Sequence, residues 1–347
     1  MLEPHQKIAI YAEATMGLIN AKMAEGIIRY GPNPVIAVID SAAAGRSLNE
    51  LCGIDSDIPV VATLDEALAR GAEVLVLGTT PSGGRLPEAW MAVIGRAIAA
   101  GLSVVNGLHD RLSDSFGDRL APGQWIWDIR TPEDAMPPIA TARAAALGNT
   151  RMLMVGTDMA VGKKTAGLEI WRTLVATGHD ACFLPTGQSG VAIRGMGIPL
   201  DAFRVDHAAG AVERLVLEHG DHDILIIEGQ GSLLHPGSTA TLPLMRGSCC
   251  NAMILCHRAG MEKLDTAGDI VVPPLREVIA LNEAVAGAAG ALTPARVVGI
   301  ALNTRNLDAA AARREIGRTE VETGLPVADP VRFGAGPLAA AVLAARG

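Results

Sequence analysis

The chain has 347 residues, of which 49% are hydrophobic and 3% aromatic, and its formal net charge is -8 at pH 7. A chain of this length exceeds the usual size of a single core, so we expect two domains. The acidic balance excludes the broad basic surface that a nucleic-acid partner requires. No apolar run reaches the roughly 18 residues of a membrane span, and the N-terminus lacks a signal-peptide core, so we expect a cytoplasmic protein with no membrane partner.

The five cysteines include no C-x-x-C pair, and an odd number of cysteines in a large chain indicates reduced thiols. We interpret the adjacent Cys249 and Cys250 as packing residues beside a strand rather than as a metal or redox site. No metal site is expected.

The first third of the chain alternates short apolar runs with stretches that can form helices. Such alternation is typical of βαβ units, so residues 1–135 are predicted to form a Rossmann-like domain with a parallel sheet. The first strand is not followed by G-x-G-x-x-G, which disfavours a nicotinamide cofactor. Strands are expected at residues 7–11, 35–39, 60–62, 74–77 and 103–106, and helices at residues 17–30, 64–69 and 87–100.

Three loops of this domain follow predicted strands, at residues 40–46, 78–85 and 106–110. Ligands of open α/β sheets bind beyond the carboxyl ends of the strands, where these loops gather. Arg85 is therefore a candidate carboxylate clamp, with a solvated surface arginine as the alternative. His109 is a candidate base, although a loop-capping role is favoured for it.

Residues 125–149 are rich in proline and show no βα unit, so we interpret the stretch as the linker, at about residues 130–149. The second domain is then residues 136–347. Its further strands are expected at residues 181–184, 224–227, 252–256 and 297–302, with a helix at residues 209–219 and a closing segment at residues 325–330.

An apolar run at residues 152–155 leads into a glycine-rich loop and then into a stretch that can continue as a helix. Such a loop directs successive backbone N–H groups, a helix dipole and a lysine ammonium at one anion. It predicts a phosphate or polyphosphate site, with a structural glycine turn as the alternative. The candidate cofactor-binding residues here are Gly156, Thr157, Asp158, Val161, Gly162, Lys163, Lys164 and Thr165.

The loop departs from the usual Walker A pattern at one position. Lys164 stands where a Ser or Thr would hold magnesium, and Thr165 comes one residue late. A second cation strengthens anion binding, whereas loss of the hydroxyl weakens the case for ATP and magnesium as cofactors.

Four apolar residues precede Glu228, which is typical of a Walker B strand, and the glycine turn G-Q-G-S follows it. A helix-capping acid is the alternative interpretation. His235 comes within reach of the same turn, and a glycine-rich loop at residues 193–201 is preceded by Gln188 and Ser189 and carries Arg194.

Several motifs together resemble a two-domain bacterial family, long of unknown function, that includes D-glutamate N-acetyltransferase. They are GTDMAVGKKT at 156–165, TGQSG at 186–190, EGQGSLLHP at 228–236, GRLP at 84–87 and NGLH at 106–109. The resemblance covers essentially the full length. The second domain is similar to dethiobiotin synthetase, which implies a P-loop NTPase-like parallel sheet and, by analogy, adenine contacts from Asn303 and Pro326.

The resemblance implies transfer of an acetyl group from acetyl-CoA to the amine of a small acidic amino acid, with D-glutamate as the first candidate. Acetyl-CoA carries a 3'-phosphate and a pyrophosphate, which suit the two-lysine loop better than ATP with magnesium. The amine must be neutral to react, so the site needs a base; Glu228 and His235 are the two candidates, with Asp158 and Asp206 weaker.

An acidic substrate also needs cations outside the phosphate loop. Arg194 is the best placed by sequence, with Arg85 from the first domain, and the remaining substrate-binding candidates are Gln188, Ser189 and Asn106. A homo-oligomer is expected. Two alternatives stay open: an ATP-dependent ligase or kinase of the dethiobiotin synthetase type, and a nucleotide-binding protein without turnover.

Overall fold

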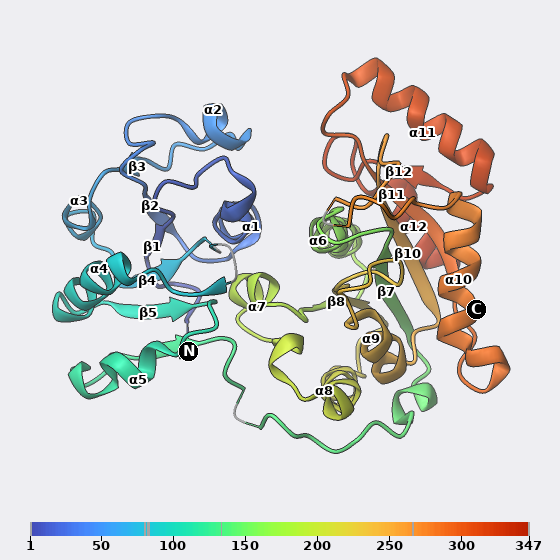
Figure 1. Ribbon diagram of the computed structural model, residues 1–347, viewed down its shortest axis with the longest axis horizontal. Coiled ribbons are helices and arrows are strands. Elements are labelled where there is room, and N and C mark those ends of the chain that lie inside the picture. Colours follow the sequence, from blue (N-terminus) through green and yellow to red (C-terminus); the bar gives the residue numbers. More distant parts are fainter. Residues whose placement is uncertain (1, 80, 82–83, 133, 266, 346–347) are drawn as a thin grey trace. The chain divides into compact units, whose positions relative to one another are not determined.

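The computed structural model describes residues 2–79, 81, 84–132, 134–265 and 267–345 (Figure 1). The chain divides into two compact units, which are Met1–Glu133 with Gln188–Ala202, and Asp134–Gly187 with Phe203–Gly347. Within the described residues each unit contains one six-stranded parallel sheet with interspersed helices, which confirms the predicted α/β class. No helix in these ranges is long and apolar enough to cross a membrane.

The sheet of the first unit has the strand order β3-β2-β1-β4-β5-β6. Its order reverses between β1 and β4, and all of its paired strands run parallel. Because β1 and β4 are buried along their whole length, they read as continuous apolar runs in the sequence. Strand β5 is equally buried but has Ser103 and Asn106 at its ends. The strands are β1 Ile8–Tyr11, β2 Val35–Ile39, β3 Val60–Val61, β4 Val74–Leu77, β5 Ser103–Asn106 and β6 Ile126–Asp128. The helices are α1 Lys22–Tyr30, α2 Leu48–Cys52, α3 Leu64–Leu68, α4 Glu88–Ala99 and α5 Leu112–Phe116.

The stretch at residues 125–149 was interpreted as a linker without a βα unit; no α-helix lies in its described residues, but strand β6, which was not predicted, does. Val104 of β5 pairs with Ile126 there, and the side-chain amide of Gln124 donates to two carbonyl oxygens, Ile98 O and Leu102 O, at the start of the strand. A three-residue strand is too short to show a periodic pattern. Only its neighbour β5 makes it a strand.

The sheet of the second unit has the order β12-β11-β10-β7-β9-β8. Strand β7 lies between β10 and β9, so the loop that follows β7 is flanked by the ends of both neighbours. The strands are β7 Thr150–Gly156, β8 Ala181–Leu184, β9 Ile224–Ile227, β10 Ala252–Arg258, β11 Arg296–Asn303 and β12 Val327–Ala328. The helices are α6 Lys163–Ala176, α8 Val205–Glu218, α9 Thr241–Ser248, α10 Leu275–Gly287, α11 Ala309–Thr323 and α12 Gly336–Ala344.

A return segment, Gln188–Ala202, belongs to the first unit although the chain on both sides of it belongs to the second. It contains helix α7, Gln188–Arg194, which packs against α1. These residues were predicted to belong to the second domain, and residues 193–201 were predicted to form a glycine-rich loop. The helix forms because its apolar residues, Val191 to Ile193, are buried in the fold, and a seven-residue helix has too few turns to be seen by periodicity.

The start of β7 depends on a buried arginine. Arg151 is 2% exposed, and its side chain donates several hydrogen bonds. Nε donates to Cys249 O at 3.1 Å, and Nη1 donates to Leu147 O and Asn149 O at 2.8 and 3.0 Å and to the side-chain Oδ1 of Asn149 at 3.1 Å. The guanidinium therefore joins the segments that lie before β7 and after α9.

We predict that Arg151→Met lowers the free energy of unfolding by about 3 to 5 kcal/mol, because it leaves several buried carbonyl groups without a donor. The measurement is urea denaturation of the full chain followed by circular dichroism. The matched control is Arg172→Met, an exposed position on α6, which should change stability by no more than about 0.5 kcal/mol. Equal losses in the two variants would contradict the role given to Arg151.

Candidate functional site

The glycine loop predicted to bind phosphate joins the end of β7 to the start of α6. Gly162, the residue before the helix, has φ +116°, a backbone conformation that favours glycine. The ammonium of Lys163 is buried and donates to the carbonyl oxygen of Asp158 at 2.7 Å. A β-carbon at Gly156 would lie 3.2 Å from this ammonium. The loop thus encloses the first lysine, while Lys164 and Thr165 lie in the first turn of α6.

Neighbouring strand ends hold this loop on two sides. Thr157 donates its backbone N–H to Cys256 O at 3.1 Å, and its hydroxyl lies 3.0 Å from Nδ1 of His257 at the end of β10. The carbonyl of Thr157 accepts from the hydroxyl of Ser232, which follows β9. Burial lowers the pKa of His257 to about 4, so the imidazole is neutral at pH 7. His257 was not among the predicted site residues; it lies within β10, and no local sequence pattern distinguishes it.

Asp158 was predicted as a cofactor contact and as a weaker candidate base, but both of its carboxylate oxygens accept hydrogen bonds from the protein backbone. Its Oδ1 accepts from the N–H of Met159 at 2.6 Å, and its Oδ2 accepts from the N–H of Asp265 at 2.9 Å. Asp265 in turn pairs with Arg258. Asp158 thereby fixes the loop to the segment after β10. Asp206, the other weaker candidate, is exposed in the first turn of α8.

Glu228 follows β9 directly and is 3% exposed. Its Oε2 accepts from the backbone N–H groups of Thr186 and Gly187, at 3.0 and 3.2 Å, and the hydroxyl of Thr186 donates to Glu228 O at 2.7 Å. The carboxylate therefore joins the carboxyl ends of β8 and β9. Its hydrogen bonds with described residues reach Oε2 and not Oε1.

Several effects act on the protonation of Glu228. Burial raises its pKa, and this effect exceeds the opposing effects of Lys164, the two backbone N–H groups and Lys163. Both lysines of the phosphate loop thus act electrostatically on the carboxylate. A buried carboxylate with a raised pKa beside fixed cations is typical of a general acid–base residue.

The glycines after Glu228 are required by close packing. A β-carbon at Gly229 would lie 1.7 Å from Met154 O and 2.9 Å from Cδ of Lys163. One at Gly231, which has φ +65°, would lie 1.8 Å from the hydroxyl of Ser238. The turn therefore passes directly beside β7 and the phosphate-loop lysine.

His235 lies at the end of this turn and is nearly buried. Its Nδ1 accepts from the backbone N–H of Gly237 at 3.1 Å, so the neutral ring carries its proton on Nε2. Asn303, at the end of β11, donates from Nδ2 to Val161 O at 3.4 Å and accepts from the N–H of Arg305. Asn303 thus contacts the phosphate loop itself.

The predicted substrate-binding residues all belong to the first unit, namely Arg85, Asn106, Gln188, Ser189 and Arg194. Asn106 is fully buried: Nδ2 donates to Asp110 O and to Asp128, and Oδ1 accepts from the N–H of Leu108. These bonds give Asn106 a structural role at the end of β5.

The two arginines of this set lie in different parts of the first unit. Arg85 is largely exposed and pairs with Asp110 at 3.1 Å. Arg194 ends α7. Thr80, Ser82 and Gly83 of the predicted loop at residues 78–85 lie outside the described residues.

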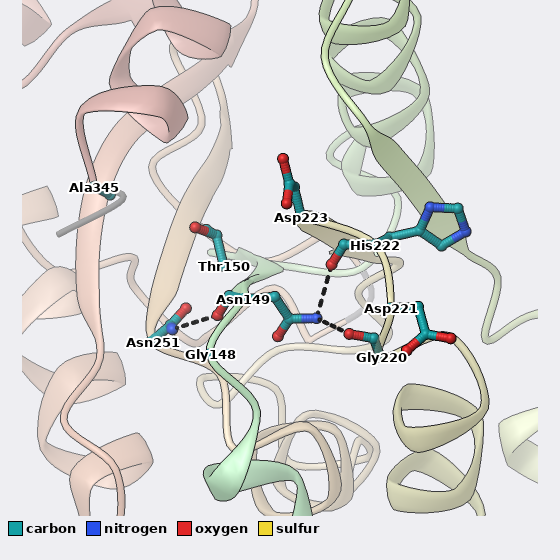
Figure 2. Close-up of a pocket in the computed structure, with 9 residues that line it drawn as sticks. All are labelled: Gly148, Asn149, Thr150, Gly220, Asp221, His222, Asp223, Asn251 and Ala345. Atoms are coloured by element: carbon teal, nitrogen blue, oxygen red, sulfur yellow. Dashed lines mark hydrogen bonds between the residues drawn. The ribbon is translucent and has the colours of Figure 1, made fainter.

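A pocket of about 420 Å³ lies at the opposite edge of the second sheet. Figure 2 shows its walls, with Asn149 donating to Gly220 O and His222 O and Asn251 donating to Asn149 O. These residues precede β7, β9 and β10, whereas the phosphate loop and Glu228 follow β7 and β9. We place the candidate site at the carboxyl edge, where the loop, its lysines and the buried carboxylate meet.

One curated protein and one crystal structure match this chain over nearly its whole length. D-glutamate N-acetyltransferase of Tritonibacter scottomollicae is 34% identical over 331 residues, which are 94% of this chain and 95% of that protein. The crystal structure of a DUF1611 family protein from Anabaena variabilis ATCC 29413 is 46% identical, with a TM-score of 0.94, covering 98% of this chain and 100% of that chain. D-glutamate N-acetyltransferase of Pseudoalteromonas sp is 34% identical over 274 residues, 78% of this chain and 81% of that protein.

Two family models also match. One, described as "Domain of unknown function (DUF1611_N) Rossmann-like domain", matches residues 41–132. The other, "Domain of unknown function (DUF1611_C) P-loop domain", matches residues 138–339. These matches confirm the resemblance predicted from the loop motifs, and the names of the two curated relatives support N-acetyltransferase activity at the level of the family. The chain belongs to the two-domain DUF1611 family, with a Rossmann-like N-terminal domain and a P-loop C-terminal domain.

Proposed function

We propose that this protein is an N-acetyltransferase that moves the acetyl group of acetyl-CoA to the amine of a small acidic amino acid, with D-glutamate as the first candidate. One observation carries the proposal: the buried carboxylate of Glu228 stands in the field of the phosphate-loop lysines. The names of the relatives at 34% identity support the same chemistry.

The composition of the phosphate loop supports a CoA thioester over ATP with magnesium. Lys163, Lys164 and the N-terminus of α6 together present positive charge to an anion. The position of the magnesium-binding hydroxyl is taken by Lys164. The phosphates of CoA need cations and N–H donors but no metal ion, so the residues present fit them.

In the proposed reaction the neutral amine attacks the thioester carbonyl carbon, and Glu228 accepts the proton that the amine loses. The C–S bond then breaks, the acetyl group stays on nitrogen as an amide, and the same carboxyl group returns the proton to the departing CoA thiolate. Negative charge on the carbonyl oxygen requires fixed donors, for which the glycine turn after Glu228 and the loop lysines are the candidates. His235 is the alternative base.

An ATP-dependent ligase or kinase is the second candidate, since the arrangement of loop, lysine and acidic strand end is shared with P-loop NTPases. The two functions make opposite predictions for ligand binding. We predict that acetyl-CoA or CoA raises the melting temperature of the full chain more than ATP with magnesium does, because a bound ligand stabilises by mass action. A larger shift with ATP that a chelator abolishes would favour the ligase.

We predict that Lys163→Ala weakens acetyl-CoA binding by about 1.5 to 3 kcal/mol, which is the range for a hydrogen bond to a charged group. The measurement is isothermal titration calorimetry. Lys263→Ala, at an exposed position of the same unit, is the matched control and should leave the affinity unchanged. If the two variants bind acetyl-CoA equally well, the loop is not the cofactor site.

We predict that Glu228→Gln lowers the turnover number about 100-fold to 10,000-fold, because it keeps the shape and removes the basicity. The assay is thiol release from acetyl-CoA with D-glutamate, and Glu218→Gln at the exposed end of α8 is the control. The wild-type rate should rise with pH through the raised pKa of Glu228, since only the ionised carboxylate accepts a proton. The variant should lack this rise.

Two results would contradict these assignments. If Glu228→Gln keeps near wild-type turnover while His235→Ala loses it, His235 is the base. If the wild-type protein releases no thiol with any acidic amino acid, the acetyltransferase proposal is wrong for this chain.

A further inference from the structure

We propose that the first unit holds a carboxylate-binding site anchored by Arg130, and that this site receives the acidic substrate. The identity of the ligand as the acetyl acceptor rests on the proposed function. The existence of a carboxylate site rests on the geometry of the first unit alone.

Arg130 lies at the carboxyl edge of the first sheet, the edge at which ligands of open parallel sheets bind. It follows β6 by two residues, and the N–H of Ile129 continues the ladder to β5 by donating to Asn106 O. The carboxyl ends of β4, β5 and β6 are adjacent in this sheet, and the strand order reverses one strand further on, between β1 and β4. Such a reversal is the usual position of a ligand crevice in this class of fold.

The guanidinium of Arg130 is buried but only partly satisfied. Its side chain is 9% exposed, and Nε donates to Gly107 O at 2.8 Å. Nη1 forms an ion pair with Asp201 but no hydrogen bond with the described residues. The described contacts leave Nη2 available. Burial lowers the pKa of Arg130, which reflects the cost of keeping a cation away from water, and an anion is the group that offsets that cost.

Asp201 only partly supplies this anion. Its side chain is 49% exposed and lies at the end of the return segment, in the short turn Leu200–Ala202. A half-exposed carboxylate can remain solvated while a ligand carboxylate takes the free side of the guanidinium. Because the two carboxylates would then repel each other, Asp201 should weaken ligand binding.

Two further groups belong to the same edge. Thr79, just after β4, is fully buried, and its hydroxyl has no hydrogen-bond partner among the described residues. A buried hydroxyl of this kind is uncommon and indicates an absent partner. His109, after β5, lies in the fields of both Arg130 and Arg85. The carboxyl edge of this sheet thus carries both a buried cation and a buried hydroxyl that has no partner among the described residues.

The competing explanation is that Arg130 merely clamps the return segment through Asp201. The two explanations predict different effects of Asp201→Asn on ligand affinity. If Arg130 binds a ligand beside Asp201, then Asp201→Asn removes a competing charge and tightens ligand binding. If Arg130 only clamps the segment, Asp201→Asn loosens the fold and gains no affinity.

The test is calorimetric titration of D-glutamate, and of glutarate, into the full chain. We expect Arg130→Lys to raise the Kd for D-glutamate about tenfold or more, because a lysine cannot form the planar fork, and Asp201→Asn to lower it. Neither should alter the affinity for acetyl-CoA, and in the transfer assay Arg130→Lys should raise the KM for D-glutamate. Arg119→Lys, at an exposed position of the same unit, is the matched control and should change none of these values.

Unchanged D-glutamate affinity in Arg130→Lys, weaker binding in Asp201→Asn together with a lower melting temperature, or no carboxylate binding by the wild-type protein would each overturn the site. Arg130-dependent binding without any thiol release would leave the site standing and remove the acetyltransferase proposal. Acetyl transfer that is insensitive to Arg130→Lys would support the acetyltransferase proposal and remove Arg130 from the substrate site.

Discussion

The candidate site depends on how a buried carboxylate is kept in the fold. Glu228 has almost no contact with water, so it requires hydrogen-bond donors, and the N–H groups of Thr186 and Gly187 supply them. These donors come from the end of the neighbouring strand, β8. Directly after Gly187 the chain leaves the second unit for the return segment. The residues that orient the proposed base are therefore the residues at which the chain changes domain.

The phosphate loop is held between β9 and β10, the two strands that flank β7. Thr157 contacts a neutral imidazole on the β10 side and the hydroxyl of Ser232 on the β9 side, while Asp158 anchors the loop to the segment after β10. Contacts of this kind hold the loop and its lysines in one geometry beside the Glu228 carboxylate. A preorganised set of donors and charges costs little further ordering when a ligand binds.

The candidate residues are distributed over both units. The phosphate loop, Glu228, His235 and Asn303 belong to the P-loop domain, whereas the arginines considered for the acidic substrate, Arg85, Arg130 and Arg194, belong to the other unit. Arg194 does so through the return segment, although its place in the sequence lies well within the P-loop domain. Under the proposed function, an acidic substrate needs cations distinct from those proposed to hold phosphate, and these arginines are the candidates.

The sequence by itself determined the α/β class, the strands around the phosphate loop and the position of Glu228 at the end of a buried strand, because continuous apolar runs, glycine spacing and a carboxylate after a strand are local signals. Only the tertiary structure decided the rest. Strand β6 exists through its pairing with β5, helix α7 through its packing on α1, and the structural role of Asn106 through bonds to Asp110 and Asp128. Arg130 and His257 escaped notice for the same reason: their environment is made by residues distant in the chain, and no local pattern carries that information.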